Sequence, residues 1–370
     1  MERDAQSRIT VGVMTGTSLD GIDACAVRVH GHGMTMRAEH LGYASIPLGE
    51  LAVPLRAMAD DEPLPASMVA SLRRLLGERC AEAVAALPLD DPVDLVAVHG
   101  QTVHHAPPES WQLIDPFPIA NRFRCRVASD LRGLDRAAGG RGAPITPMAD
   151  WVLHRGPEAR VIVNLGGFIN CTTLPEEGND SPRSEVDGFD VCPCNHLLDA
   201  VARLALDAPY DEGGTLAQSG TACLSHLELI ARHLRGMDGR SRSLGSGDEC
   251  TEFVPDVMHA IGPADAAATF CAAIAACLQS TLEDCPAETL LLAGGGTRNA
   301  ALVRAIEERT EPTRSVGRLP HGDEREAASM AVLAALAEDG VPITLPGITG
   351  RGTSGIRDGL WCLPESDQTP

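Results

Sequence analysis

The sequence contains no lysine, and all 30 of its basic residues are arginine. A P-loop with its phosphate-reaching lysine is therefore excluded, as are the lysine–glutamate pair of protein kinases and Schiff-base catalysis. Any nucleotide that this protein binds must be held by other groups.

A net basic charge, long apolar runs and an N-terminal apolar segment typical of a signal peptide are also lacking. The formal net charge is −21 and the pI about 4.9, which disfavours nucleic acid and anionic membranes as partners. The 12 cysteines fit a reducing compartment, so we expect a cytoplasmic protein. Cys25, Cys271 and Cys277 stand in apolar segments and are expected to be small core residues, whereas Cys192-Pro193-Cys194 needs separate consideration.

A chain of 370 residues exceeds the size at which one hydrophobic core usually stops growing, which predicts two domains with a cleft. A strand–glycine turn–strand pattern occurs twice, which indicates an internal duplication. We place the domains at residues 1–158 and 159–370. Periodicity predicts strands at 9–14, 24–29, 94–98, 161–165, 168–174 and 290–293, and helices at 67–87, 195–206, 264–282, 299–309 and 324–337.

The first turn lies within Gly12–Asp23, a segment rich in glycine, hydroxyl and carboxylate groups and poorly suited to an apolar core. Backbone N–H groups freed by glycine can face phosphate oxygens, and the hydroxyls add donors. Asp20 or Asp23 could hold Mg²⁺, which prefers oxygen ligands. The residues expected to contact the nucleotide here are Gly16, Thr17, Ser18, Leu19, Asp20, Gly21, Ile22 and Asp23.

Two further glycine turns occur in the second half of the chain. Asn164, Gly166 and Gly167 would approach the phosphates from the opposite domain. Gly294, Gly295 and Gly296 stand between a strand and a helix that begins near Asn299, where a helix N-terminus favours negative charge. Such turns are common structural devices, but three of them favour nucleotide binding.

The chain resembles the anhydro-N-acetylmuramic acid kinase family of the actin-like ATPase superfamily, because these turns and further segments occur in the order found in that family. The resemblance covers nearly the whole chain and rests on Met14–Asp23, His99–Thr102, Asp130–Pro144, Asn164–Gly167, Gly188–Asp190, Tyr210-Asp211, Gly294–Gly296 with Asn299, and Arg325–Ala327. It implies an α/β fold of two actin-like (ribonuclease H-like) domains around a central cleft for ATP and sugar. It also implies conversion of 1,6-anhydro-N-acetylmuramic acid, ATP and water to N-acetylmuramic acid 6-phosphate and ADP in cell-wall recycling.

The resemblance assigns Asp190 as the catalytic carboxylate, which takes a proton from the attacking water. From spacing alone, Asp190 could equally cap the helix that begins near Asn195. Residues expected to contact the sugar are His99, Gln101, Thr102, Arg132 and Glu326, although His99 could be a polar surface residue and Arg132 and Glu326 could join internal salt bridges. Family members are often dimers, so a homodimer is expected, with ATP and Mg²⁺ as cofactors.

The chain departs from the family pattern beside the catalytic aspartate and on the sugar side. Cys192 and Cys194 stand where the family usually has glycine, and a sulfur atom there would narrow the site if either position needs positive φ. Ile114 replaces a common glycine, and Phe117 a usual asparagine. Three alternatives stay open: a working family enzyme, a kinase for another anhydro sugar, or a catalytically weak nucleotide-binding protein. A fourth is a redox or zinc role for Cys192 and Cys194 with His196.

Overall fold

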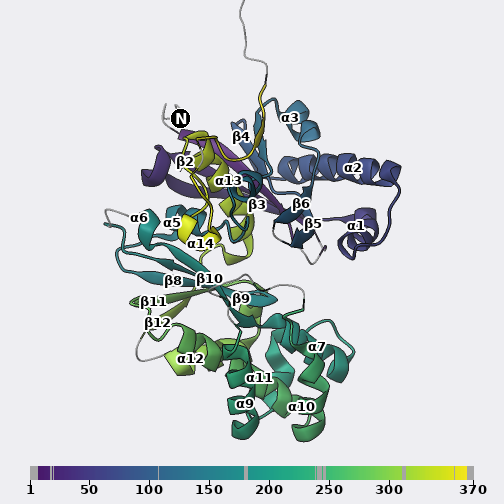
Figure 1. The fold of residues 1–370 in the computed structure, drawn as a ribbon, viewed down its shortest axis with the longest axis vertical. Coiled ribbons are helices and arrows are strands. Elements are labelled where there is room, and N and C mark those ends of the chain that lie inside the picture. Colours follow the sequence, from purple (N-terminus) through teal and green to yellow (C-terminus); the bar gives the residue numbers. More distant parts are fainter. Residues whose placement is uncertain are drawn as a thin grey trace, which may run out of the picture. The chain divides into compact units, whose positions relative to one another are not determined.

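The computed structural model describes residues 7–16, 19, 21–106, 108–178, 182–237, 239, 244, 247–310, 314–353 and 355–364. Within these residues the chain forms two compact α/β units (Figure 1). Unit 1 comprises Met1–His154 together with Glu324–Pro370, and unit 2 comprises Arg155–Asp323. Thr17, Ser18 and Asp20, three of the residues predicted to contact the nucleotide, lie outside the described part of the chain.

Unit 1 is built on a six-stranded sheet in the order β13-β7-β4-β1-β2-β3, with a separate β5-β6 hairpin. Apolar residues on one face of the sheet form a core with α2, and α13 packs against β1 and β2. The strands of unit 1 are β1 (Ser7–Thr15), β2 (Gly21–His30), β3 (Arg37–Pro47), β4 (Leu95–Val98), β5 (Gln101–Ala106), β6 (Glu109–Leu113), β7 (Arg126–Ser129) and β13 (Leu360–Cys362). Its α-helices are α1 (Ala52–Ala59), α2 (Ala66–Ala85), α3 (Phe117–Phe123), α4 (Gly133–Ala137), α5 (Pro147–His154), α13 (Arg325–Glu338) and α14 (Pro346–Thr349).

Unit 2 is built on a five-stranded sheet in the order β10-β9-β8-β11-β12, and its largest core lies between this sheet and helices that include α7, α9 and α11. Its strands are β8 (Arg160–Leu165), β9 (Phe168–Leu174), β10 (Asp187–Pro193), β11 (Thr289–Ala293) and β12 (Ser315–Arg318). Its α-helices are α6 (Pro182–Glu185), α7 (Asn195–Leu206), α8 (Thr215–Ser219), α9 (Leu224–Arg235), α10 (Val254–Ile261), α11 (Pro263–Thr281) and α12 (Ala300–Thr310).

The two sheets share one strand topology. In each, the first three strands form an antiparallel meander, and the fourth and fifth lie parallel to the first on its other side. The order β3-β2-β1-β4-β7 in unit 1 matches β10-β9-β8-β11-β12 in unit 2. This repetition confirms the predicted duplication and the two-domain α/β class.

The C-terminal segment belongs to unit 1, which corrects the predicted assignment of 324–370 to the second domain. Helix α13, yellow-green in Figure 1, packs against the purple strands β1 and β2 although it is far from them in sequence. The close approach requires Gly12 on β1, because a Cβ there would lie 1.9 Å from the backbone oxygen of Ala327 and 2.5 Å from the nitrogen of Ala331. Strand β13 completes the return by pairing with β7.

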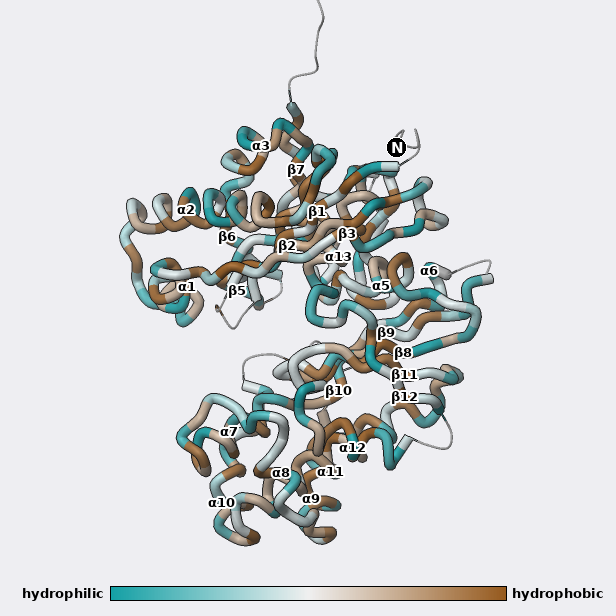
Figure 2. The backbone as a smooth tube through the Cα atoms, turned by 180° about the vertical axis from the view of Figure 1, so that it is seen from behind, coloured by the Kyte–Doolittle hydropathy of each residue, from teal (hydrophilic) through white to brown (hydrophobic). Residues whose placement is uncertain are grey.

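Periodicity located the central elements well. Strand β9 and helix α7 have the predicted bounds, and the other predicted strands and helices differ from the observed ones by a few residues at their ends. Helices α11 and α13, which are mostly brown to white in Figure 2, bury most of their residues, as expected for nearly continuous apolar segments.

Candidate active site

The two predicted glycine turns of unit 2 meet at one edge of its sheet. Strands β8 and β11 are parallel neighbours in which Ala293 is paired with Asn164, so their carboxyl ends lie side by side. Gly294 follows β11 with φ +82°, and a Cβ there would lie 2.6 Å from Asn164 Oδ1 and 2.9 Å from the Leu165 oxygen. Only glycine can adopt this positive φ without strain and leave room for Asn164 and Leu165. The close contact of the two turns therefore depends on Gly294.

The N-terminus of α7 is bonded to the β8–β9 turn. The backbone N–H of Cys194 donates to the Gly167 oxygen at 2.7 Å, and that of Asn195 donates to the Gly166 oxygen at 3.0 Å. The Asn195 side chain donates to the Leu165 oxygen at 3.1 Å. These bonds fix the predicted phosphate turn against the start of the helix that follows Asp190.

Asn299 and Gly296 have local structural roles beside this edge. Asn299 Oδ1 accepts hydrogen bonds from the N–H groups of Ala301 and Leu302, both at 3.1 Å, and so caps α12. A Cβ on Gly296 would lie 2.7 Å from Leu165 Cβ, so this glycine allows the turn after β11 to pack on β8. The structure thus brings together Asn164, Gly166, Gly167, Gly294, Gly295, Gly296 and Asn299.

Asp190 lies on β10 next to a β-bulge that separates the face of its side chain from the face of Cys192. Asp190 is paired with Asn170, whereas Cys192 is paired with Ile169, so one extra residue, Val191, separates the two pairs. Because neighbours along a strand face opposite sides, Asp190 shares the face of Asn170 and Cys192 shares the face of the buried Ile169. Asp190 therefore faces away from the core that holds its neighbour Phe189, and the bulge turns Cys192 back into that core.

Asp190 is held by hydrogen bonds to the loop residues Gly239 and Leu244 and by its cross-strand pairing in the sheet. Leu244 donates its backbone N–H to Asp190 Oδ2 at 2.8 Å, and the Asp190 N–H donates to the Gly239 oxygen at 3.2 Å. Across the sheet Asp190 pairs with Asn170, and Asn170 pairs with Asn164. Asn170 was not selected from the sequence, although the alternation of polar and apolar residues in β9 marks its face.

Both cysteines beside Asp190 are core residues. Cys192 and Cys194 are 0% exposed, and neither has positive φ. The Cys192 thiol interacts with Cys277, which together with burial raises the pKa of Cys192. Burial likewise raises the pKa of Cys194. Among the residues that the structure describes, Cys192, Cys194 and His196 do not form a group able to share a metal ion.

In unit 1 the predicted phosphate hairpin joins β1 and β2. Leu19, with φ 59°, donates its N–H to the Gly16 oxygen at 3.2 Å, which closes the turn. Ile22 is fully buried and Gly21 begins β2, so these two residues support the hairpin. Asp23 accepts a hydrogen bond from Tyr43 at 2.6 Å. Burial of Tyr43, followed by that hydrogen bond, raises the pKa of the tyrosine.

His99 and Arg132, both predicted to contact sugar, contact each other. Arg132 Nε donates to His99 Nε2 at 2.9 Å, and Arg132 Nη1 donates to the Gly142 oxygen at 2.8 Å. His99 Nδ1 lies 2.9 Å from the Gly100 oxygen, so both ring nitrogens are engaged within unit 1. Burial, with the Arg132 charge, lowers the pKa of His99 to about 3, and the residue is 2% exposed. His99 therefore acts as a neutral acceptor that positions Arg132.

The other predicted sugar residues differ in their surroundings. Gln101 is buried, and its Oε1 accepts no hydrogen bond from the described part of the chain. Gln112 Nε2 donates to Thr102 Oγ1 at 3.4 Å. Glu326 is exposed in the first turn of α13, and its charge raises the Arg132 pKa, although burial, the larger cause, lowers that pKa to about 10.

Two adjoining cavities of unit 1, of about 500 and 550 Å³, share Ser110, Trp111 and Arg136 in their walls. The larger one is also lined by Ile114 and Phe117, the positions where the chain departs from the family pattern. Ile114 fits there because Gly100 has no Cβ, and a Cβ at Gly100 would lie 2.9 Å from that of Ile114. Trp111 and Arg136 were not selected from the sequence, although Arg136 lies within the family-like segment Asp130–Pro144.

The two units thus define an α/β protein with duplicated strand–glycine turn–strand hairpins and a carboxylate fixed beside the second. Residues 8–356 match the family described as anhydro-N-acetylmuramic acid kinase. Relatives of that name include one from Salinibacter ruber, 34% identical over 93% of each chain, and one from Acidiphilium cryptum, 35% identical over 92% of this chain and 94% of the relative. The chain belongs to the anhydro-N-acetylmuramic acid kinase family and is an enzyme of the phosphotransferase class.

None of the described helices is long and apolar enough to cross a membrane.

Proposed function

We propose that this enzyme opens 1,6-anhydro-N-acetylmuramic acid with water and phosphorylates O6, using ATP and Mg²⁺ and giving N-acetylmuramic acid 6-phosphate and ADP. The proposal rests on family membership and on one observation: the Asp190 carboxylate lies on the face of β10 that is turned away from the core, in the row that leads through Asn170 to Asn164. Such a reaction would serve the recycling of cell-wall sugar in the cytoplasm. The proposed assembly is a homodimer, which light scattering can test.

Asp190 is the proposed general base. Its carboxylate takes a proton from the water whose oxygen bonds to the anomeric carbon. The bond from that carbon to O6 breaks, and O6 takes the γ-phosphoryl group as the bond to the ADP leaving oxygen breaks. The hydrogen bond from Leu244 to Oδ2 fixes the orientation of the base.

The nucleotide is proposed to lie against the glycine turns. A Cβ at Gly167 would lie 2.5 Å from the His196 ring, and one at Gly294 would meet Asn164, so these glycines are needed for the turns to pack as they do. In unit 1, the Gly16 backbone and the backbone and hydroxyl groups of Thr17 and Ser18 are proposed to donate hydrogen bonds to the phosphates, while Leu19 closes the turn.

The donor set in unit 1 fits Mg²⁺, since Asp23 supplies carboxylate oxygens, one of which Tyr43 orients. We propose that Asp20 or Asp23 holds the ion, with water completing its coordination. When bound, Mg²⁺ neutralises charge on the phosphates during transfer.

The sugar is proposed to contact Gln101, Thr102, Arg132 and Glu326, with His99 acting through Arg132. The buried Gln101 oxygen is consistent with this, because an acceptor left without a donor costs about 1–3 kcal/mol that a sugar hydroxyl or amide would recover. Arg136 lines both cavities and is a second guanidinium able to bind the lactyl carboxylate.

The test is ADP release with 1,6-anhydro-N-acetylmuramic acid, comparing the wild type with Asp190→Asn. We expect the variant to lose about 10²- to 10⁴-fold in kcat while its melting temperature changes little, because asparagine can still accept from Leu244. The matched control is Asp207→Asn on the surface of the same unit. Absence of sugar-stimulated turnover by the wild type would refute the enzyme proposal.

Two alternatives predict different results. Turnover with a different anhydro sugar would favour an altered substrate, as the Ile114 and Phe117 side chains in the unit 1 cavity would explain. Stabilisation by ATP without consumption of any sugar would favour a nucleotide-binding protein of weak activity. The core location of Cys192 and Cys194 supports the working enzyme.

A further inference from the structure

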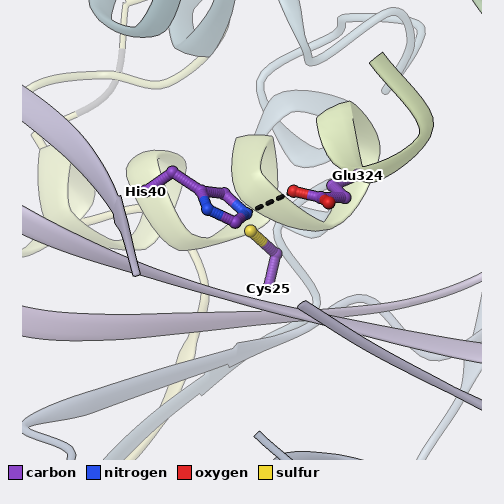
Figure 3. Close-up of side chains that lie close together, drawn as sticks. All are labelled: Cys25, His40 and Glu324. Atoms are coloured by element: carbon purple, nitrogen blue, oxygen red, sulfur yellow. Dashed lines mark ion pairs between the residues drawn. The ribbon is translucent and has the colours of Figure 1, made fainter. Parts of the chain in front are cut away.

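Cys25, His40 and Glu324 bring three different metal-ligating groups together in unit 1, and none of them is among the residues proposed to bind ATP or sugar. Cys25 lies on β2, His40 on β3, and Glu324 is the N-cap residue of α13. Their ligand atoms all lie within 4.8 Å of one another. Figure 3 shows the thiol, the imidazole and the carboxylate pointing toward a common centre, with an ion pair between His40 Nε2 and Glu324 Oε2.

A β-bulge on β3 places His40 in this group. Ala26 pairs with Gly42, but Val27 pairs with His40, so Leu41 is an extra residue on β3. Leu41 packs toward the core on the α2 side, and the bulge turns His40 to the opposite face, which Cys25 shares. Without the extra residue His40 would lie opposite Arg28 and face away from Cys25.

The third ligand, Glu324, reaches the group because the chain returns to unit 1 after it has formed unit 2. Helix α13 packs against β1 and β2, which positions Glu324, at its start, over the strand that carries Cys25. Gly12 makes that packing possible through its contact with Ala327. The three groups thus come from parts of the sequence that are up to about 300 residues apart, and the fold holds them in place before any ion binds.

We propose that Cys25, His40 and Glu324 bind a divalent transition metal ion, with Zn²⁺ the best match. A thiolate, an imidazole and a carboxylate are each zinc ligands, and three protein ligands leave one tetrahedral position for water or another molecule. The thiolate disfavours Mg²⁺ and Ca²⁺, which prefer oxygen. The site is therefore distinct in chemistry from the Mg²⁺ site of the proposed function.

The geometry requires only a small adjustment. In a tetrahedral zinc site the imidazole nitrogen and the carboxylate oxygen are roughly 3.4 Å apart, so the His40–Glu324 pair would open to admit the ion. The His40 and Glu324 side chains are 23% and 18% exposed, which gives an ion access, whereas Cys25 is fully buried. Burial, then the Glu324 charge, raises the pKa of Cys25 to about 12, so the ion must displace the thiol proton.

Cobalt titration of the full-length, chelator-treated protein tests the site, because Co²⁺ bound to thiolate gives a charge-transfer absorption in the near ultraviolet. We expect one equivalent of Co²⁺ to produce this absorption and Zn²⁺ to abolish it. Cys25→Ser should lose the absorption, and His40→Gln and Glu324→Gln should weaken binding by at least about tenfold. Cys80→Ser, which changes another fully buried thiol of unit 1, is the matched control and should bind as the wild type does.

A second readout is thermal: Zn²⁺ should raise the melting temperature of the wild type and of Cys80→Ser but not of His40→Gln or Glu324→Gln. Equal cobalt absorption in the wild type and Cys25→Ser, or no binding near one equivalent, would overturn the proposal and leave an ion pair beside a core thiol. None of these measurements uses kinase activity, so a protein without sugar turnover can still support the metal site.

Discussion

Arg132 Nε donates a hydrogen bond to His99 Nε2 at 2.9 Å, so a neutral histidine holds the guanidinium. The same arginine binds the Gly142 oxygen, which ties the segment after α4 to the end of β4 through one side chain. His99 follows β4 directly, and its backbone N–H donates to the Val13 oxygen on β1. The position of Arg132 therefore depends on the central strands of unit 1.

Replacing His99 by leucine should destabilise the protein. The substitution leaves the Arg132 Nε–H without its acceptor inside unit 1, which costs about 1–3 kcal/mol in the free energy of unfolding. Urea denaturation measures this loss. His104→Leu, an exposed histidine on β5, is the control and should change stability by less than about 0.5 kcal/mol. Equal effects of the two substitutions would contradict the role assigned to His99.

The His99–Arg132 pair also predicts that the free energy of unfolding depends on pH. His99 has a pKa of about 3 in the folded protein because of burial and the Arg132 charge, against an ordinary value of 6.5. Between these values the unfolded chain binds the extra proton, so stability is lost as the pH falls below 6.5, by about 2 kcal/mol at pH 5. Unfolding curves of the wild type at several pH values should show a steeper loss than those of His99→Leu. An equal loss of stability with falling pH in the two proteins would contradict the low pKa of His99.

Gly294→Ala should damage both the fold and nucleotide binding. The new Cβ would lie 2.6 Å from Asn164 Oδ1 at a residue with φ +82°. We expect a loss of about 1–3 kcal/mol in stability and ATP binding at least about tenfold weaker, which corresponds to about 1.4 kcal/mol. Calorimetry with a non-hydrolysable ATP analogue measures the latter. Gly178→Ala in the same unit, where a Cβ meets nothing within 4 Å, should match the wild type.

Returning Cys192 and Cys194 to glycine should not raise activity. Each thiol fills space in the core of unit 2, so the double substitution removes buried atoms and adds backbone freedom, costing about 2–5 kcal/mol. Cys223→Gly, at a partly exposed position before α9, is the milder control. A double variant with higher kcat than the wild type would show that the sulfur atoms obstruct the reaction and would restore the case for a weakened homologue.

The sequence predicted the elements whose residues follow a single period, such as β9, α7 and α11. It did not reveal β5 and β6, which pair with each other in a short hairpin, or β13, which acquires its strand conformation from pairing with the distant β7. Bulges were equally invisible, since the pairing that makes Val191 and Leu41 extra residues involves other strands. The glycine turns were found because composition marks them, whereas the bond between His99 and Arg132 depends on tertiary structure.

The return of α13 and β13 to unit 1 has a consequence for synthesis of the chain. Unit 2 is one continuous segment, so all of its residues have been made before Glu324 is added. Unit 1 lacks the helix that covers β1 and an edge strand of its sheet until about residue 362 has left the ribosome. Unit 2 can therefore complete its fold first. The N-terminal part of unit 1 can complete its fold only after the C-terminal segment has been synthesised. A chain truncated after residue 323 should retain a folded unit 2 and lose unit 1, which limited proteolysis would reveal.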